Sequence, residues 1–358
     1  MEANKKYRFE PDYAVPPGQT LAEVMNSLGM TQKELAARTD LTVQTLNRIF
    51  NGKQPITYET ANRLELVTNV PANFWNNLEA GFQEQKAKLA ERERMAADTE
   101  WLKSIPTKEL IERGFIESPR DKVALLREVL RFYGVSSVAA WHEIWEKPAV
   151  AARRSSRFAS QPGPASAWIR QGELQAQAIP CEPYDKDRFM GALREVRALT
   201  RETSDVFESR MIELCARAGV AIALVKEMEK APWSGATKWL RPDKAMILLS
   251  LRGKAEDRFW FSFFHEASHV LHDKKKELFI DDGNHDDPRE MRADEFAAEF
   301  LIPAKYNDKI KNLADPSSVI ELADELEIAP GIVAGRYQFL TGKWNYHKEL
   351  IRGLVWER

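Results

Sequence analysis

The chain has 358 residues and a formal net charge of −2, with 44% hydrophobic and 30% charged residues. This length exceeds what one hydrophobic core usually organises, so we expect a soluble protein of two or three domains. No apolar run approaches the length of a membrane span, and the near-neutral charge excludes a global basic field for nucleic acid. The N-terminus lacks a signal-peptide core, and Cys181 and Cys215 alone form no disulfide framework, which predicts a cytoplasmic location.

Residues 1–80 are predicted to form a bundle of short helices that includes a helix-turn-helix. Thr31 and Glu34 have the spacing of a capping box at the start of one helix. A turn follows at Asp40, and Thr42 can cap a second helix over 43–50. Asn51 and Gly52 then provide the stop signal that ends this second helix.

The second of these helices is predicted to be a DNA-recognition helix. Leu46 and Ile49 are spaced to face the core of the bundle. The polar residues left outside can contact base edges or phosphates in a major groove, and they are Thr42, Gln44, Thr45, Asn47 and Arg48. Residues 1–80 hold eight Lys/Arg and nine Asp/Glu, a local net charge of −1, so a monomer would bind operator DNA modestly. Two alternatives stay open: the protein binds DNA as a homodimer that reads two half-sites, or a protein partner occupies the same surface.

Residues 81–164 are predicted to be a helical connector. The stretch 71–101 is rich in charge with a thin apolar stripe, which favours a solvated helix over a dimerisation helix. Apolar residues at helical spacing over 110–130 predict an amphipathic helix. The small basic cluster at 153–157 precedes prolines and a glycine, so we interpret it as an exposed loop rather than a phosphate-binding site.

From residue 165 onward, helices alternate with candidate strands at 220–225, 237–240 and 245–250. The predicted fold class is therefore a mainly α N-terminal half, followed by an α+β domain with a small β-sheet over 165–358. The sheet directly precedes a motif rich in histidine.

The motif is His265-Glu266-Ala267-Ser268-His269. On a helix, histidines four residues apart project from one face about one turn apart, which is the geometry that two zinc ligands require. Glu266 lies beside the first histidine, where its carboxylate can act as general base on a water molecule without being a ligand. His272 is interpreted as a capping or core histidine, and nothing in the spacing of His285 requires a role for it.

A zinc peptidase keeps one coordination position open, so one further protein ligand must come from elsewhere in the chain. In the helix predicted to follow, Glu290 and Asp294 share a side with small residues, which allows close approach to the motif helix, whereas Glu299 falls on the other side. The predicted zinc ligands are His265, His269 and Glu290. Asp294 is predicted to hold a ligand histidine by its other ring nitrogen. The alternative is a helix with ordinary surface acids.

Two parts of the chain resemble known families. Residues 17–80 resemble the HigA-type antitoxin branch of the Xre/Cro family. The residues that carry this likeness are Gly29-Met30-Thr31-Gln32-Lys33-Glu34-Leu35-Ala36, Asn51-Gly52-Lys53 and Asn73-Phe74-Trp75. Residues 165–345 are similar to ImmA/IrrE metallopeptidases through the stretches 264–272 and 290–303. Two departures, Ala267-Ser268 in place of the frequent Leu-Gly and Asp294 in place of Asn, remove no ligand.

This resemblance implies a zincin-like domain in a bacterial or phage regulator, whose peptidase cuts a repressor under stress and so relieves repression. It also implies that the helix-turn-helix-like stretch 320–333 has a structural role.

Two functions stay open. The first is a DNA-binding regulator with a zinc endopeptidase that cleaves an Xre-type repressor or a toxin–antitoxin partner, laid along the edge of the sheet. The second is a non-proteolytic antitoxin or autorepressor with a structural or sensory metal.

Overall fold

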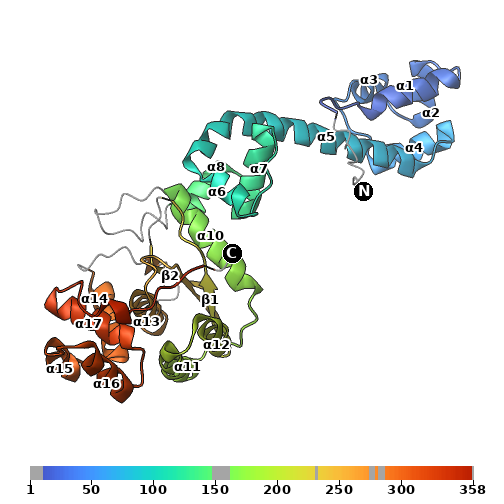
Figure 1. The fold of residues 1–358 in the computed structure, drawn as a ribbon. Coiled ribbons are helices and arrows are strands. Elements are labelled where there is room, and N and C mark those ends of the chain that lie inside the picture. The colour runs from blue at the N-terminus through green and yellow to red at the C-terminus, as the bar shows by residue number, and fades with distance from the viewer. Residues whose placement is uncertain (1–10, 147–161, 230–232, 274–278, 281–286, 357–358) are drawn as a thin grey trace, which may run out of the picture. The chain divides into compact units, whose positions relative to one another are not determined.

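The computed structural model describes residues 11–146, 162–229, 233–273, 279–280 and 287–356 (Figure 1). The chain divides into two compact units, Met1–Glu100 and Trp101–Arg358, each with its own hydrophobic core. The helical elements and the small sheet confirm the predicted fold class. The three predicted domain ranges stay predictions. The basic cluster at 153–157 and His285 lie outside the described residues.

The first unit is a helical bundle. Its helices among the described residues are α1 (Pro17–Ser27), α2 (Gln32–Thr39), α3 (Val43–Phe50), α4 (Tyr58–Thr68) and α5 (Ala72–Asp98). The hydroxyl of Thr31 accepts from the backbone N–H of Glu34 at 3.2 Å, as the predicted cap requires. The reciprocal half of the predicted capping box is wrong, because the Glu34 carboxylate accepts from Arg38 at 2.6 Å.

The core of the first unit forms where α1 crosses α3. Leu46 and Ile49 are buried as predicted, together with Trp75 from α5. A Cβ atom on Gly18 would lie 2.2 Å from the carbonyl oxygen of Ile49, so the two helices approach too closely for a larger residue. This crossing leaves the opposite side of α3 to solvent.

The second unit contains further helices. Its α-helices within the described residues are α6 (Thr107–Glu112), α7 (Lys122–Tyr133), α8 (Val138–Trp141), α10 (Pro162–Ala178), α11 (Lys186–Ala198), α12 (Ser204–Ala216), α13 (Glu256–His272), α14 (Pro288–Leu301), α15 (Asn307–Lys311), α16 (Pro316–Leu326) and α17 (Pro330–Thr341). The guanidinium of Arg113 joins the early helices to the rest of the unit. It donates to the carbonyl oxygens of Lys226 and Glu227, each at 2.8 Å.

The sheet has four strands in the order β1-β3-β2-β4. Their bounds are β1 (Val220–Leu224), β2 (Gly235–Arg241), β3 (Lys244–Leu249) and β4 (Phe279–Ile280). β1 runs parallel to β3, whereas β2 is antiparallel to both β3 and β4. The three predicted strands are confirmed, and the two-residue β4 was not predicted because so short a run carries no periodicity.

Helices cover both faces of this sheet. Ile247 of β3 belongs to the same core cluster as Phe263 of α13. The next residue, Leu248, points to the other face, where a Cβ on Gly172 of α10 would lie 2.7 Å from its methyl groups. Every residue of β3 is consequently buried, which explains the continuous apolar run in the sequence.

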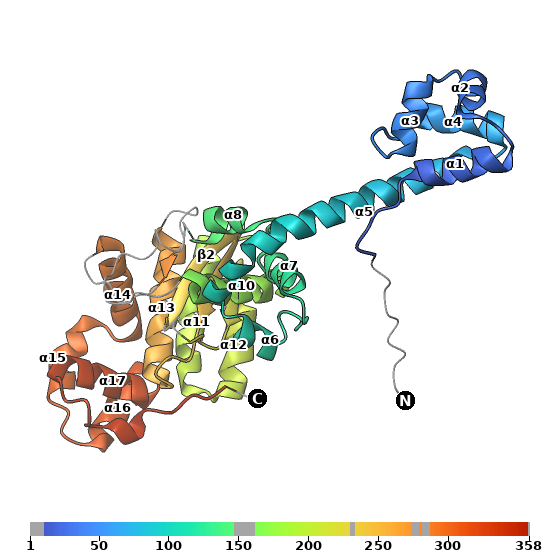
Figure 2. The same cartoon turned by 90° about the horizontal axis from the view of Figure 1, so that it is seen from above.

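The helix α13 lies in the core of the second unit, between the sheet and α14 and α17 (Figure 2). Its start is fixed by Arg352, whose guanidinium donates to the buried carboxylate of Glu256 at 2.5 Å. Side chains on Gly331 or Gly335 of α17 would collide with Glu256 and Asp257. The end of the stretch 320–333, which was predicted to have a structural role, therefore packs against α13. No helix in the described part of the chain combines the length and the apolarity of a membrane span.

Candidate metal centre

Two imidazole rings meet on one face of α13. The predicted helix places His265 and His269 one turn apart, and their Nε2 atoms lie 3.2 Å from each other. Both side chains are almost completely buried, at 4% and 1% exposed. Imidazoles so far from solvent need polar partners, because an unsatisfied polar group in a protein interior is costly.

A carboxylate from α14 completes the cluster. α14 lies against α13 along a seam that includes Ala293 and Ala297, both with no exposed surface. Their small size brings Glu290 close, so that its Oε2 atom lies 3.0 Å from Nε2 of His265 and 3.6 Å from Nε2 of His269. The three donor atoms all lie within 4.8 Å of one another. Two nitrogens and one oxygen that converge in this way fit a zinc ion with one coordination position left over.

The other ring nitrogens are held by carboxylates. Nδ1 of His265 lies 2.9 Å from Oδ1 of Asp294, which is where the sequence places the supporting acid. Nδ1 of His269 lies 2.7 Å from Oδ2 of Asp273, and Asp273 is in turn paired with Arg292. Each imidazole is thereby oriented with Nε2 toward the common point. Asp273 was not among the predicted residues, although its i,i+4 spacing from His269 is a usable signal.

The electrostatics of the cluster favour a cation. Burial alone would raise the pKa of Glu290, but hydrogen bonds from His265 and His269 outweigh burial and lower this pKa to about 2. Burial would lower the pKa of His269, yet hydrogen bonds to Asp273 and Glu290 and the negative charge of Glu266 raise it to about 9. A pocket that stabilises positive charge this strongly suits a divalent metal as well as a proton.

Glu266 is completely buried and lies against β2. The hydroxyl of Thr237 donates to its Oε2 atom at 2.6 Å. A Cβ atom on Gly235 would lie 2.5 Å from its Oε1 atom, so only glycine leaves room for the carboxylate. Neither residue was predicted, since both are distant from the motif in sequence and only the packing of the strand on α13 brings them together.

The residues predicted to contact DNA lie on α3 and its cap. Gln44, Asn47 and Arg48 are exposed on the side away from Leu46. The hydroxyl of Thr42 accepts from the backbone N–H of Thr45 at 3.0 Å, and the two threonine hydroxyls lie 2.9 Å apart. These two threonines therefore form the helix cap, and the exposed residues behind them offer longer side chains for base or phosphate contacts.

Two stretches of the chain match models of known families. Residues 21–75 match the helix-turn-helix family. Residues 220–337 match the IrrE N-terminal-like domain, a peptidase family, and this stretch contains His265, His269, Glu290 and Asp294. The resemblances inferred from the sequence are confirmed for these two stretches, and the second indicates a metallopeptidase-like fold.

Several solved structures are similar to part of the chain, among them two antidote proteins. One is described as an antidote protein of a plasmid maintenance system from Nostoc punctiforme; it is 23% identical, with coverage of 23% of this chain and 89% of that chain and a TM-score of 0.22. The other is an addiction module antidote protein of a HigA family from Coxiella burnetii; it is 26% identical, with coverage of 30% and 98% and a TM-score of 0.20. No curated protein matches the chain.

Proposed function

We propose that this chain, which joins a helix-turn-helix to an IrrE N-terminal-like domain, is a transcriptional regulator with a zinc-dependent endopeptidase site. The observation that carries the proposal is the convergence of His265, His269 and Glu290 next to the buried carboxylate of Glu266. These are the residues that would hold zinc. When bound, zinc would supply a Lewis acid that polarises a peptide carbonyl and makes a water molecule more acidic.

Glu266 is the group that we assign to proton transfer. Its carboxylate takes a proton from the attacking water and delivers it to the nitrogen of the departing amine, so that the peptide bond breaks. The hydrogen bond from Thr237 sets the orientation of this carboxylate. Asp294 and Asp273 hold the two imidazoles in place throughout.

The substrate is proposed to lie along the edge of the small sheet. In that sheet, β2 carries both Gly235 and Thr237, which contact Glu266, so a peptide at this edge would pass near the reactive carboxylate. The substrate class that we propose is a regulatory protein, either an Xre-type repressor or a toxin–antitoxin partner. This choice rests on the helix-turn-helix in the same chain, which ties the peptidase to transcription.

The helix-turn-helix is proposed to bind operator DNA through the exposed face of α3. Arg48 and Asn47 are the side chains best suited to phosphate and base contacts. Because residues 1–80 carry a net charge of −1, we propose a homodimer that combines two weak half-site contacts. The proposed location is the cytoplasm, where operator DNA is found.

The proposal is tested by incubating the full chain with the repressor or toxin–antitoxin partner encoded beside it. Glu266→Gln should abolish cleavage and retain zinc, because the side chain keeps its size but loses its basicity. The matched control is Glu295→Gln, which makes the same change on the exposed side of α14. Unchanged cleavage in Glu266→Gln would refute the mechanism.

One observation favours the alternative of a non-proteolytic antitoxin or autorepressor. β4 already pairs with β2 at Ala236 and Thr237, on the edge that a substrate strand would use. In this alternative, the metal stabilises the fold or senses a signal. Operator binding would then depend on Asn47 and Arg48 and would be unaffected by Glu266→Gln.

A further inference from the structure

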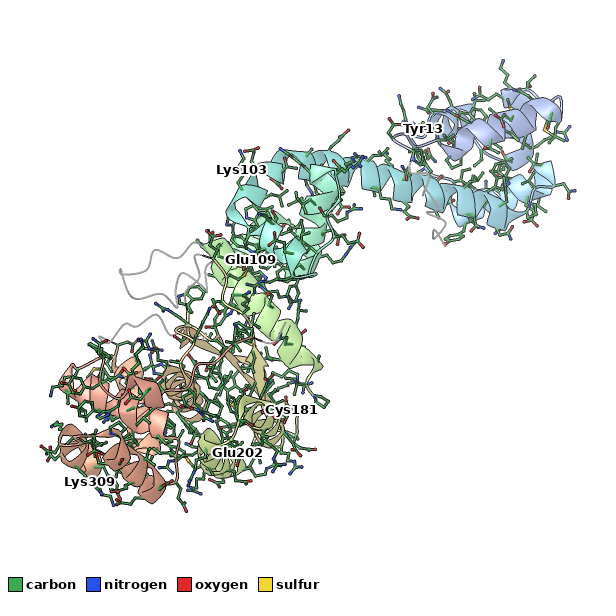
Figure 3. The ribbon with its side chains drawn as sticks, in the orientation of Figure 1. Tyr13, Lys103, Glu109, Cys181, Glu202 and Lys309 are labelled. Carbon is green, nitrogen blue, oxygen red and sulfur yellow. The ribbon has the colours of Figure 1, made fainter. Side chains whose placement is uncertain are left out.

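The two cysteines of the chain are neighbours in the second unit although they are far apart in sequence. Cys181 lies between α10 and α11 (Figure 3), and Cys215 lies in the last turn of α12. The backbone N–H of Glu182 donates to the carbonyl oxygen of Ala216 at 3.0 Å, so the residues that follow the two cysteines are directly bonded. This bond brings the two thiol-bearing backbones side by side.

The segment that carries Cys181 is fixed by further backbone contacts. The backbone N–H of Asp185 donates to the carbonyl oxygen of Ala218 at 3.3 Å. The backbone N–H of Tyr184 donates to the carbonyl oxygen of Asp243 at 2.8 Å. Gly219 has a positive φ of 84°, and a Cβ atom there would lie 2.2 Å from Cα of Tyr184. The close approach of the segment to the end of α12 is therefore a built feature of the fold.

A buried cation lies beside the first thiol. Lys244, at the start of β3, is only 5% exposed, and its ammonium donates to the carbonyl oxygen of Ile179 at 2.5 Å. The sulfur of Cys181 lies 3.7 Å from the same oxygen. The ammonium and the thiol thus share one carbonyl, which places positive charge where a thiolate would form.

The two thiols differ in access and influence each other. Cys181 is partly exposed, whereas Cys215 is completely buried. Burial raises the pKa of the Cys181 thiol, and the positive charges of Lys244 and Arg241 offset only part of this rise. Burial also raises the pKa of Cys215, and negative charge on Cys181 adds to that rise. An oxidant in solution would therefore meet Cys181 first.

We propose that Cys181 and Cys215 are a redox-active pair that forms an intramolecular disulfide when the protein meets a peroxide. The Cys181 thiol loses its proton and the sulfur attacks the peroxide; the O–O bond breaks, a sulfenic acid forms, and the released hydroxide takes up the proton as one water. The Cys215 thiol gives up its proton as its sulfur attacks the sulfenic acid; the S–O bond breaks, and the departing hydroxide leaves with that proton as a second water. Two electrons and two protons have passed from the thiols to the peroxide.

The disulfide would reinforce the support of the metal centre. It closes a loop that contains α11 and most of α12, and α12 carries Phe207 against the motif helix. The ring of Phe207 lies 4.8 Å from that of Trp260 and 5.7 Å from that of Phe259, measured between centroids. Closing this loop restricts the unfolded chain, so oxidation should stabilise the second unit.

The experiment uses the full chain treated with hydrogen peroxide, then alkylated before denaturation and digested without reductant. We expect one cross-linked peptide pair that contains Cys181 and Cys215 within a single chain. The melting temperature should rise by roughly 5 °C and return on addition of dithiothreitol. Cys215→Ser should accumulate a sulfenic acid at Cys181 that dimedone traps, whereas Cys181→Ser should leave Cys215 as a thiol.

Lys244→Met should slow disulfide formation several-fold, with Lys226→Met as the matched control because Lys226 is exposed. Retention of both thiols in the wild-type chain, over-oxidation of Cys181 without a cross-link, or a cross-link between chains would each overturn the proposal. These readouts are independent of peptidase activity and of zinc.

Discussion

The hydroxyl of Thr237 donates a 2.6 Å hydrogen bond to the carboxylate of Glu266, across 29 residues of sequence. This bond links a strand of the sheet proposed to align the substrate with the group proposed to move the proton. In the proposed mechanism, β2 would therefore orient the carboxylate, which is completely buried.

Thr237→Val should lower kcat by about tenfold to a hundredfold, because the side chain keeps its shape but no longer holds Glu266. Zinc content and KM should change little. Thr237→Ser retains the hydroxyl and should restore most of the activity. The measurement is steady-state cleavage of the partner protein, and equal activity of the valine and serine variants would show that the hydrogen bond has no role.

Gly235→Ala should also reduce cleavage by about tenfold or more, since the added methyl group would lie 2.5 Å from the Glu266 carboxylate. The matched control is Gly191→Ala in α11, where a Cβ atom meets nothing within 4 Å. That control should keep full activity and be slightly more stable, because alanine favours a helix over glycine. Comparable losses in both variants would indicate a general loss of folding.

Asp273→Asn should weaken zinc binding by about tenfold to a hundredfold, because Nδ1 of His269 loses its anionic partner. Competition with a chelator of known affinity measures this change. Asp308→Asn, at a side chain that is 93% exposed, is the control. If the two variants bound zinc equally well, Asp273 would have no part in the centre.

The stability of the zinc-free protein should depend on pH through His269. Its pKa in the folded protein is about 9, above the ordinary value of 6.5, so its charge stabilises the fold fully below pH 6.5. This contribution is lost as the pH rises through 9. Because the pKa of Glu290 is lowered, this carboxylate changes its charge only at acidic pH, so it does not affect stability between pH 6.5 and 9. Thermal unfolding should therefore show a falling melting temperature between about pH 6.5 and 9, and a rise over that range would contradict the assignment.

Arg48→Ala should weaken operator binding. It should also reduce the salt dependence of the binding constant by the release of about one counterion. Arg48 is exposed on α3, so the change removes a phosphate or base contact without opening the core. Arg38→Ala is the control, since Arg38 is paired with Glu34 on α2. Binding titrations at several salt concentrations measure both effects, and equal affinities and slopes for wild type and Arg48→Ala would exclude Arg48 as a DNA contact.

The sequence predicts those parts of the centre that depend on local periodicity. His265 and His269 follow from helical spacing, and Glu290 and Asp294 follow from the small-residue side of one further helix. The contacts of Thr237 and Gly235 with Glu266 depend on how β2 packs on α13, which no local pattern encodes. β4 consists of two residues, and so short a strand is defined only by its partner. Asp273 differs from these, because its spacing from His269 was visible in the sequence.

The reciprocal capping box at Thr31 illustrates another limit. The sequence pattern allowed Glu34 to reach back to the cap, but Arg38 lies one turn further along the same helix and pairs with it instead. Two partners with similar local spacing compete, and a charged partner forms the stronger hydrogen bond. Sequence spacing alone therefore identifies the candidates, whereas the charges decide between them.

The most direct test of the proposed zinc site is the metal content of the purified full chain, measured by inductively coupled plasma mass spectrometry. We expect about one zinc per chain in the wild type and in Glu266→Gln, and a large loss of zinc in Glu290→Ala. Zinc should bind tightly again after removal with a chelator and dialysis. A wild-type chain that is purified without zinc and fails to bind it would contradict both the metal centre and the mechanism built on it.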